Sequence, residues 1–189
     1  MDVKSAMPDM EKARELVSDG RLWPLVRDFL WRAEASCGDE KIFADFSEPG
    51  PARIMLLDAA TIDKIARWIG VVVYARHLGA ITDGASVRAL KSALPGAYPE
   101  VFAYTAYFKN VPAAPKAGEF AGLSPDERAE VVAEAGRSIL LGAVKDSPAA
   151  VLEAFCGKLG QAEPIESDAK FISTALKLRF PEAYRLCFS

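Results

Sequence analysis

The chain has 189 residues, and its 23 Lys and Arg against 26 Asp and Glu give a formal net charge of -3 with the single His neutral. A composition that is 51% hydrophobic and 26% charged is that of a folded globular protein and excludes global disorder. An isoelectric point of about 5.3 argues against nucleic acid as a partner. This length predicts one compact domain over 1–189.

Neither a membrane anchor nor a disulfide framework is indicated. The longest core-like uncharged run, Trp68 to Ala75, is far shorter than the roughly 20 apolar residues that cross a bilayer, so we expect no direct membrane insertion. The charged N-terminus lacks the apolar block of a signal peptide. Three widely separated cysteines, Cys37, Cys156 and Cys187, are typical of a reduced cytoplasmic protein.

The first part of the chain predicts two helices and an irregular stretch. Apolar residues recur at helical spacing over 9–18 and again over 21–37. Residues 38–51 then turn polar and are rich in turn-forming residues, so they predict a loop. The apolar run at 53–57 is a short strand or a buried extended lead-in, and its periodicity does not decide between the two.

The strongest helical pattern covers residues 58–78. Asp58 or Thr61 can cap its N-terminus, and Gly79 can end it. The valines at 71–73 favour a strand locally, but the apolar spacing outside them is helical over a longer stretch and predicts a helix.

An aromatic-rich segment follows a second, shorter helix. Asp83 can cap a helix over 85–94. Residues 100–109 then carry four aromatic side chains, which we expect to lie in the core with the tyrosine hydroxyls at its edge, a ligand-binding box being the alternative. These side chains are Phe102, Tyr104, Tyr107 and Phe108.

Residues 110–123 form the clearest linker, because Ala, Pro and Gly dominate them, and they are a candidate internal seam. Directly after it, Ser124 and Glu127 form a capping box that predicts a helix to about residue 145. Further helices are predicted over 147–159 and over 168–179.

Three details complete the predicted fold. Ser167 can cap the helix over 168–179, and Pro181 opens a short terminal turn. Gly136 and Gly142 interrupt a good helix at a cost near 1 kcal/mol each, which favours close packing as their role. The fold class is therefore predicted to be all-α, a single compact bundle of orthogonal type with 53–57 as its one candidate extended segment.

The inventory of catalytic groups is thin. One His and three scattered Cys do not supply the ligands of a structural zinc site, and no phosphate-binding glycine motif is present. Carboxylate pairs one helical turn apart are best explained as solvated faces. These pairs are Glu11/Glu15, Glu127/Glu130 and Glu130/Glu134. We predict no catalytic residue, no metal ligand and no cofactor.

His77 is the one residue on which an alternative reading rests. Near a helix C-terminus, a histidine interacts favourably with the helix dipole, which is a structural role. Any nucleophilic mechanism would have to use it, since it is the only imidazole in the sequence. The alternative is therefore a small helical enzyme or ligand-binding domain that uses His77 and the tyrosine-rich segment.

The order of the segments resembles the K component of bacterial type III secretion sorting platforms, the YscK/SctK-like family. Three groups of stretches carry the resemblance. The first is the loop at 46–51 that leads into the Gly-centred helix at 62–74, and the second is Ile81 followed by 87–90 and 98–102. The third is 136–140, 155–159 and 175–181 before the terminal Leu186-Cys187-Phe188.

The resemblance implies a non-enzymatic cytoplasmic adaptor. It would dock the pod protein of the sorting platform to the cytoplasmic domain of the inner-membrane ring protein, so these two proteins are the expected partners. Exposed aromatic and arginine side chains are what such an interface needs.

Two places in the sequence are candidate partner contacts. The first is Trp68 with its neighbours Lys64 and Arg67, and the second is the linker with Lys116 and Phe120. The structural alternative is that Trp68 belongs to the core and that Phe120 pins a loop.

Overall fold

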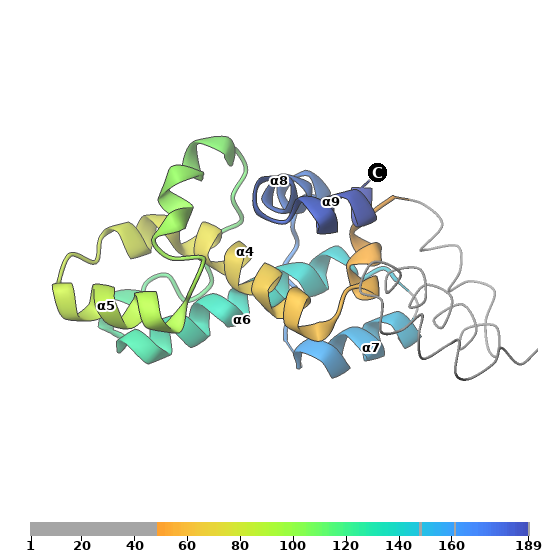
Figure 1. The fold of residues 1–189 in the computed structure, drawn as a ribbon. Helices are drawn as coiled ribbons and strands as arrows, with labels where there is room; N and C mark the ends of the chain where they lie inside the picture. The colour runs from red at the N-terminus through yellow and green to blue at the C-terminus, as the bar shows by residue number, and fades with distance from the viewer. Residues whose placement is uncertain (1–48, 148, 161, 189) are drawn as a thin grey trace, which may run out of the picture. The chain divides into compact units, whose positions relative to one another are not determined.

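The computed structural model describes residues 49–147, 149–160 and 162–188 (Figure 1). The chain divides into two units, Met1–Ala44 and Asp45–Ser189, and all the described residues belong to the second. The helices predicted over 9–18 and 21–37 lie outside the described residues.

Every regular element in the described residues is helical, which confirms the all-α fold class. The α-helices are α4 (Ala59–Gly79), α5 (Gly84–Ala93), α6 (Pro125–Ala143), α7 (Ala149–Leu159), α8 (Ala169–Arg179) and α9 (Pro181–Phe188). Short 3-10 helices are η2 (Pro51–Leu56), η3 (Glu100–Ala103), η4 (Thr105–Tyr107) and η5 (Phe120–Gly122). None of the helices in this part of the chain is both long and apolar enough to cross a bilayer.

Helix starts follow the capping chemistry of the sequence. The Asp58 carboxylate accepts a hydrogen bond from the Thr61 backbone N–H at 2.8 Å, and α4 begins at the next residue. Ser124 and Glu127 cap each other's backbone N–H at the start of α6, as the capping box predicts. Asp83 caps α5 in the same way.

Helices α4 and α6 lie side by side and form the most extensive helix pairing (Figure 1). Gly70 of α4 faces the backbone of Val132, and Gly136 of α6 faces that of Ala66. A Cβ at either glycine would overlap the opposing carbonyl oxygen, so only glycine permits this approach. The packing role expected for Gly136 is confirmed.

Buried apolar side chains from both sides of this pairing form the core. Helices α7 and α8 also pack on α4, while α9 packs on α8 and η2. The largest fully buried side chains are Trp68, Tyr74, Phe120, Phe155, Ile54, Met55, Ile62, Ile65, Ile69, Leu78, Leu90 and Leu94.

Helix α4 ends at Gly79, as expected, with Ala80 as its C-cap. Two local predictions are corrected. Residues 53–57 are not an extended segment, because Pro51 starts the 3-10 helix η2 and only Leu57 has extended angles (φ -81°, ψ 156°). Asp168, not Ser167, caps α8, since its carboxylate accepts from the Lys170 N–H at 2.9 Å.

The linker at 110–123 connects two parts of the same unit. Helices α4 and α5 precede it and α6 follows it, and both α4 and α5 pack on α6. Its own backbone is fixed by the Tyr74 hydroxyl, which donates a hydrogen bond to the Pro115 carbonyl.

Candidate docking surface

Exposed hydrophobic side chains gather on one segment, residues 100–112, which we call the aromatic loop. It comprises η3, η4 and the non-helical residues that follow them. Phe102 is 40% exposed, Tyr107 62% and Val111 40%, and these are the exposed large hydrophobic residues of the described part of the chain. Exposed apolar residues concentrated in this way are typical of interaction sites.

The prediction that the aromatic side chains lie in the core is therefore wrong for Phe102 and Tyr107. The segment forms two short 3-10 turns with a break at Tyr104, so it presents no continuous apolar stripe to the core. Val101 is the residue of η3 that is fully buried, whereas Tyr104 and Phe108 are half-buried.

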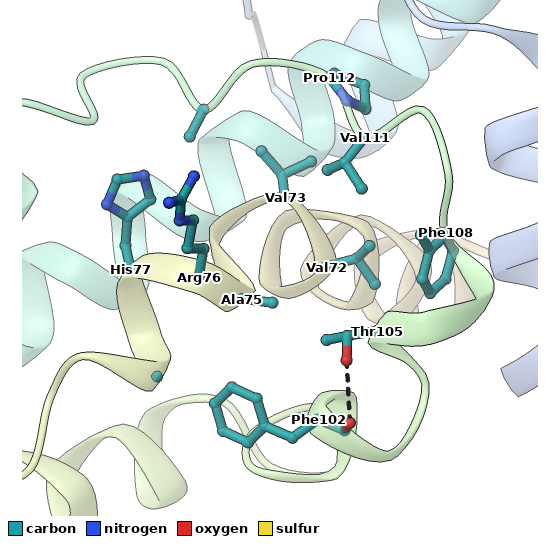
Figure 2. A pocket seen from close by; sticks show the side chains of 12 residues that line it. Val72, Val73, Ala75, Arg76, His77, Phe102, Thr105, Phe108, Val111 and Pro112 are labelled. Carbon is teal, nitrogen blue, oxygen red and sulfur yellow. Dashed lines mark hydrogen bonds between the residues drawn. The ribbon is translucent and has the colours of Figure 1, made fainter.

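A pocket of about 650 Å³ separates the aromatic loop from α4 (Figure 2). Helix α4 forms its floor, and Phe102, Phe108 and Val111 of the loop stand around it. The residues that line it are Val72, Val73, Ala75, Arg76, His77, Gly79, Phe102, Thr105, Phe108, Val111, Pro112 and Ala114. We refer to this pocket together with the neighbouring Tyr107 as the apolar face.

The charge at the pocket is positive and confined to one end. Arg76 and His77 lie together on one side, while Phe108 lies on the opposite side with Val72 and Val73 nearer the middle (Figure 2). No Asp or Glu is among the described residues that line the pocket. The Thr105 hydroxyl is engaged, since it donates to the Phe102 carbonyl at 3.2 Å.

His77 is held by aromatic contacts rather than by an acid–base partner. Its ring centroid lies 5.9 Å from those of Tyr74 and Phe120. Among the described residues, no hydrogen bond or ion pair joins His77 to a carboxylate or to a nucleophile, which is the arrangement that covalent catalysis requires. The pocket can thus bind an apolar group beside an anion.

Trp68, predicted as a partner contact, is instead part of the core with 1% of its surface exposed. The edge of its ring meets Tyr104 with centroids 5.6 Å apart, and the Arg179 guanidinium lies 5.9 Å from the ring centre. These covering groups come from residues 36 and 111 positions further along the chain, so local spacing does not reveal them. The Trp68 indole N–H is buried and has no hydrogen-bond partner within the described part of the chain.

Phe120 is also buried, with 2% of its surface exposed, which is the structural alternative stated for it. Its ring packs on Tyr74 with centroids 4.6 Å apart and has the Arg128 guanidinium 6.0 Å from its centre. Phe120 therefore pins the end of the linker onto α4.

The three basic candidates stay at the surface, but they do not form one patch with the apolar face. Lys64 is exposed, and the Arg67 Nε donates to the Asp63 carboxylate at 2.7 Å. Arg67 precedes Arg76 by nine residues, which is roughly 14 Å of helix rise. Lys116 forms an ion pair with Glu134 at 3.1 Å.

The carboxylate pairs of α6 are used structurally. Glu127 caps the helix, the Glu130 carboxylate accepts from Arg137 at 2.5 Å, and Glu134 pairs with Lys116. No cluster of His, Cys, Asp and Glu suited to a metal ion occurs among the residues that the structure describes. The pair Glu11/Glu15 lies outside them.

The residues that sequence reasoning missed are Arg76 and Val111. The only sequence signal for Arg76 is its position next to His77 in an otherwise apolar stretch of α4, and basic residues in a last helical turn usually serve the helix dipole. Val111 lies in a segment that the sequence predicts to be a linker.

Comparisons with known protein families, with curated proteins and with solved structures find no match to this chain.

Proposed function

We propose that this protein is a non-enzymatic adaptor that binds other proteins through its apolar face. The observation that supports this most is the concentration of exposed Phe102, Tyr107 and Val111 around an apolar pocket. Folded proteins rarely leave such side chains together in water unless a partner covers them, because burying them there is favourable. Aromatic residues around an apolar hollow are also common energetic centres of protein interfaces.

For the particular setting, we propose the sorting platform of a type III secretion system. The support is the resemblance of segment order to the K component of that assembly. The partners would be the cytoplasmic domain of the inner-membrane ring protein and the pod protein, and the adaptor would work in the cytoplasm. Docking between folded surfaces requires no cofactor and no turnover.

The proposal is tested by affinity purification of the tagged full chain from its native cell, with the bound proteins identified by mass spectrometry. Recovery of the ring protein or the pod protein is the expected result. Tyr107→Asp should reduce that recovery, because it places a charge within the apolar interface. Ser92→Asp, which adds the same charge at an exposed site on α5, should not.

Two outcomes contradict parts of the proposal separately. If neither platform protein is recovered under conditions that preserve weak complexes, the secretion assignment is wrong. If both are recovered but the double variant Lys64→Glu/Arg67→Glu abolishes binding while Tyr107→Asp does not, the docking surface lies at the other end of α4.

The pocket itself supports a second candidate function, the binding of a small molecule. Its volume of about 650 Å³ and its apolar lining with few polar groups are in the range of ligand sites. Native mass spectrometry of the purified chain would show a bound metabolite, and His77→Ala should change its retention. A chain that carries no ligand would exclude this candidate for the purified protein.

A further inference from the structure

We propose that the apolar face recognises a partner segment in which a bulky apolar side chain stands close to an acidic one, with the acidic side chain bound by Arg76. This inference rests on the proposed docking function and specifies the chemistry of the partner.

The first argument is charge complementarity. Arg76 and His77 are the titratable residues of the pocket lining, and Lys109 is exposed in the adjoining loop. The Arg76 side chain is exposed and makes no ion pair within the described part of the chain. A partner that covers this guanidinium must replace its water with an anion, because a desolvated charge without a counter-ion is costly.

The surroundings of Arg76 on its other side leave it available. There a second hollow of about 560 Å³ contains Arg76, Asp83 and Arg128. The Asp83 carboxylate accepts from the Ser86 backbone N–H at 2.7 Å as the cap of α5. Arg128 donates to two backbone carbonyls of η5, at 3.1 Å and 2.7 Å. Arg128 is thus held by η5, and no ion pair joins Asp83 to Arg76 among the described residues, so the Arg76 guanidinium can bind an incoming carboxylate.

The second argument concerns the size of the occupant. The exposed apolar surface continues past the pocket to Tyr107, which is 62% exposed and is not part of the pocket lining. A small ligand held in the pocket would leave this ring in water, whereas a protein segment can cover both. The partner is therefore a polypeptide.

The arrangement within the pocket sets the spacing of the partner's side chains. The apolar end around Phe108 and Val72 suits a bulky aliphatic or aromatic anchor, and Arg76 stands at the opposite end (Figure 2). An anchor and a carboxylate close together in the partner sequence can reach both ends at once. Because Arg presents a planar set of donors, it favours a carboxylate bound through two hydrogen bonds.

The test is selection of peptides from a displayed random library on the purified full chain. Peptides that combine bulky apolar residues with a nearby Asp or Glu should be enriched. On Arg76→Glu the acidic preference should disappear and Lys or Arg should replace it. Arg88→Glu, an exposed arginine of α5 outside the pocket lining, should give the wild-type consensus. Circular dichroism would verify that each variant is folded.

A selected peptide then gives a quantitative measurement. Its affinity, followed by fluorescence anisotropy, should fall about tenfold or more on Arg76→Glu, and a peptide with Lys in place of its acidic residue should recover binding to that variant. The inference is overturned if no peptide is enriched, if the consensus lacks acidic residues, or if Arg76→Glu binds as the wild type does. If the chain dimerises and Tyr107→Asp abolishes the dimer, the apolar face binds a second copy instead. If no peptide is selected but dodecanoate binds saturably, the face binds a fatty acid instead.

Failure here is distinguishable from failure of the proposed function. If wild type and Arg76→Glu recover platform proteins from cells with equal efficiency, the proposed adaptor function stands and only the acidic recognition is wrong. A clear acidic consensus without recovery of platform proteins would retain the recognition chemistry and remove the secretion assignment.

Discussion

Replacing Gly136 by alanine puts a methyl group where α6 crosses α4. The new Cβ would lie 2.6 Å from the Ala66 carbonyl carbon and 3.0 Å from the Gly70 nitrogen, and it would overlap the Ala66 carbonyl oxygen. All three are backbone atoms, which cannot rotate away as a side chain can. The variant is accommodated only if the two helices separate, and separation loosens the core on both sides of the crossing.

The expected cost is set by two opposing terms. Overpacking a core site loses roughly 1–3 kcal/mol, and the upper end applies here because the obstacle is backbone. Alanine returns about 1 kcal/mol through its better helix propensity. Gly136→Ala should therefore lower the free energy of unfolding by about 2 kcal/mol, equivalent to roughly 4–8 °C in Tm for a chain of this size.

Urea unfolding followed by circular dichroism measures this loss, and Gly157→Ala is the matched control. Gly157 lies in α7 with no atom near the position of its Cβ, so that variant should gain up to about 1 kcal/mol. If Gly136→Ala gains stability as Gly157→Ala does, the close helix crossing is not as described. The double variant Gly70→Ala/Gly136→Ala should cost less than the sum of the single variants, since one separation of the helices relieves both overlaps.

Three further predictions concern single side chains. Tyr74→Phe removes the hydrogen bond to Pro115 and should cost about 1 kcal/mol in urea unfolding at neutral pH. Burial is the main cause that raises the pKa of Tyr74 to about 12, and the nearby Glu134 charge is the smaller cause. The stability that the protonated hydroxyl supplies is therefore complete below the ordinary pKa of 10.0 and is lost as the pH rises toward 12. Tyr74→Phe should flatten that alkaline loss, and an unchanged pH profile would contradict the assignment. Lys116 has a φ of 54°, a left-handed conformation that glycine adopts more easily than alanine. In urea unfolding, Lys116→Gly should therefore be about 1 kcal/mol more stable than Lys116→Ala. Equal midpoints would show that the left-handed backbone carries no cost. Ser124→Ala should lower stability by about 1 kcal/mol in thermal unfolding while Ser124→Asp retains most of it; equal losses in both would mean that the capping box is not needed.

Local chemistry made much of this fold predictable. The caps at Asp58 and Ser124 act on backbone groups within three residues, so the sequence around each one contains the whole interaction. The helical spacing of α4 likewise outweighs its three central valines, because a helix is determined by its whole apolar face and not by three residues. The role of Gly136 was also predictable, since an internal glycine is unfavourable unless something approaches closely.

Burial set by distant parts of the chain was not predictable in this way. The sequence around Trp68 leaves a partner contact and a core position both open, and the structure shows the core position, where Tyr104 and Arg179 cover the ring. In contrast, the sequence predicts Phe102 and Tyr107 to be core residues, yet they are 40% and 62% exposed. The apolar face was missed for this reason, because its position depends on where the aromatic loop meets α4.

The contact between η2 and α9 also bears on the order in which the chain folds. The Gly50 N–H donates to the Cys187 carbonyl at 2.6 Å, and Arg53 donates to the Leu186 carbonyl at 3.2 Å. These bonds join residues that are more than 130 positions apart, so closing them is slow compared with forming any one helix. During synthesis on the ribosome, Ile54 and Met55 leave the exit tunnel long before α9 exists to cover that end of the molecule. The apolar start of this unit therefore lacks its contact with α9 until that helix has been made.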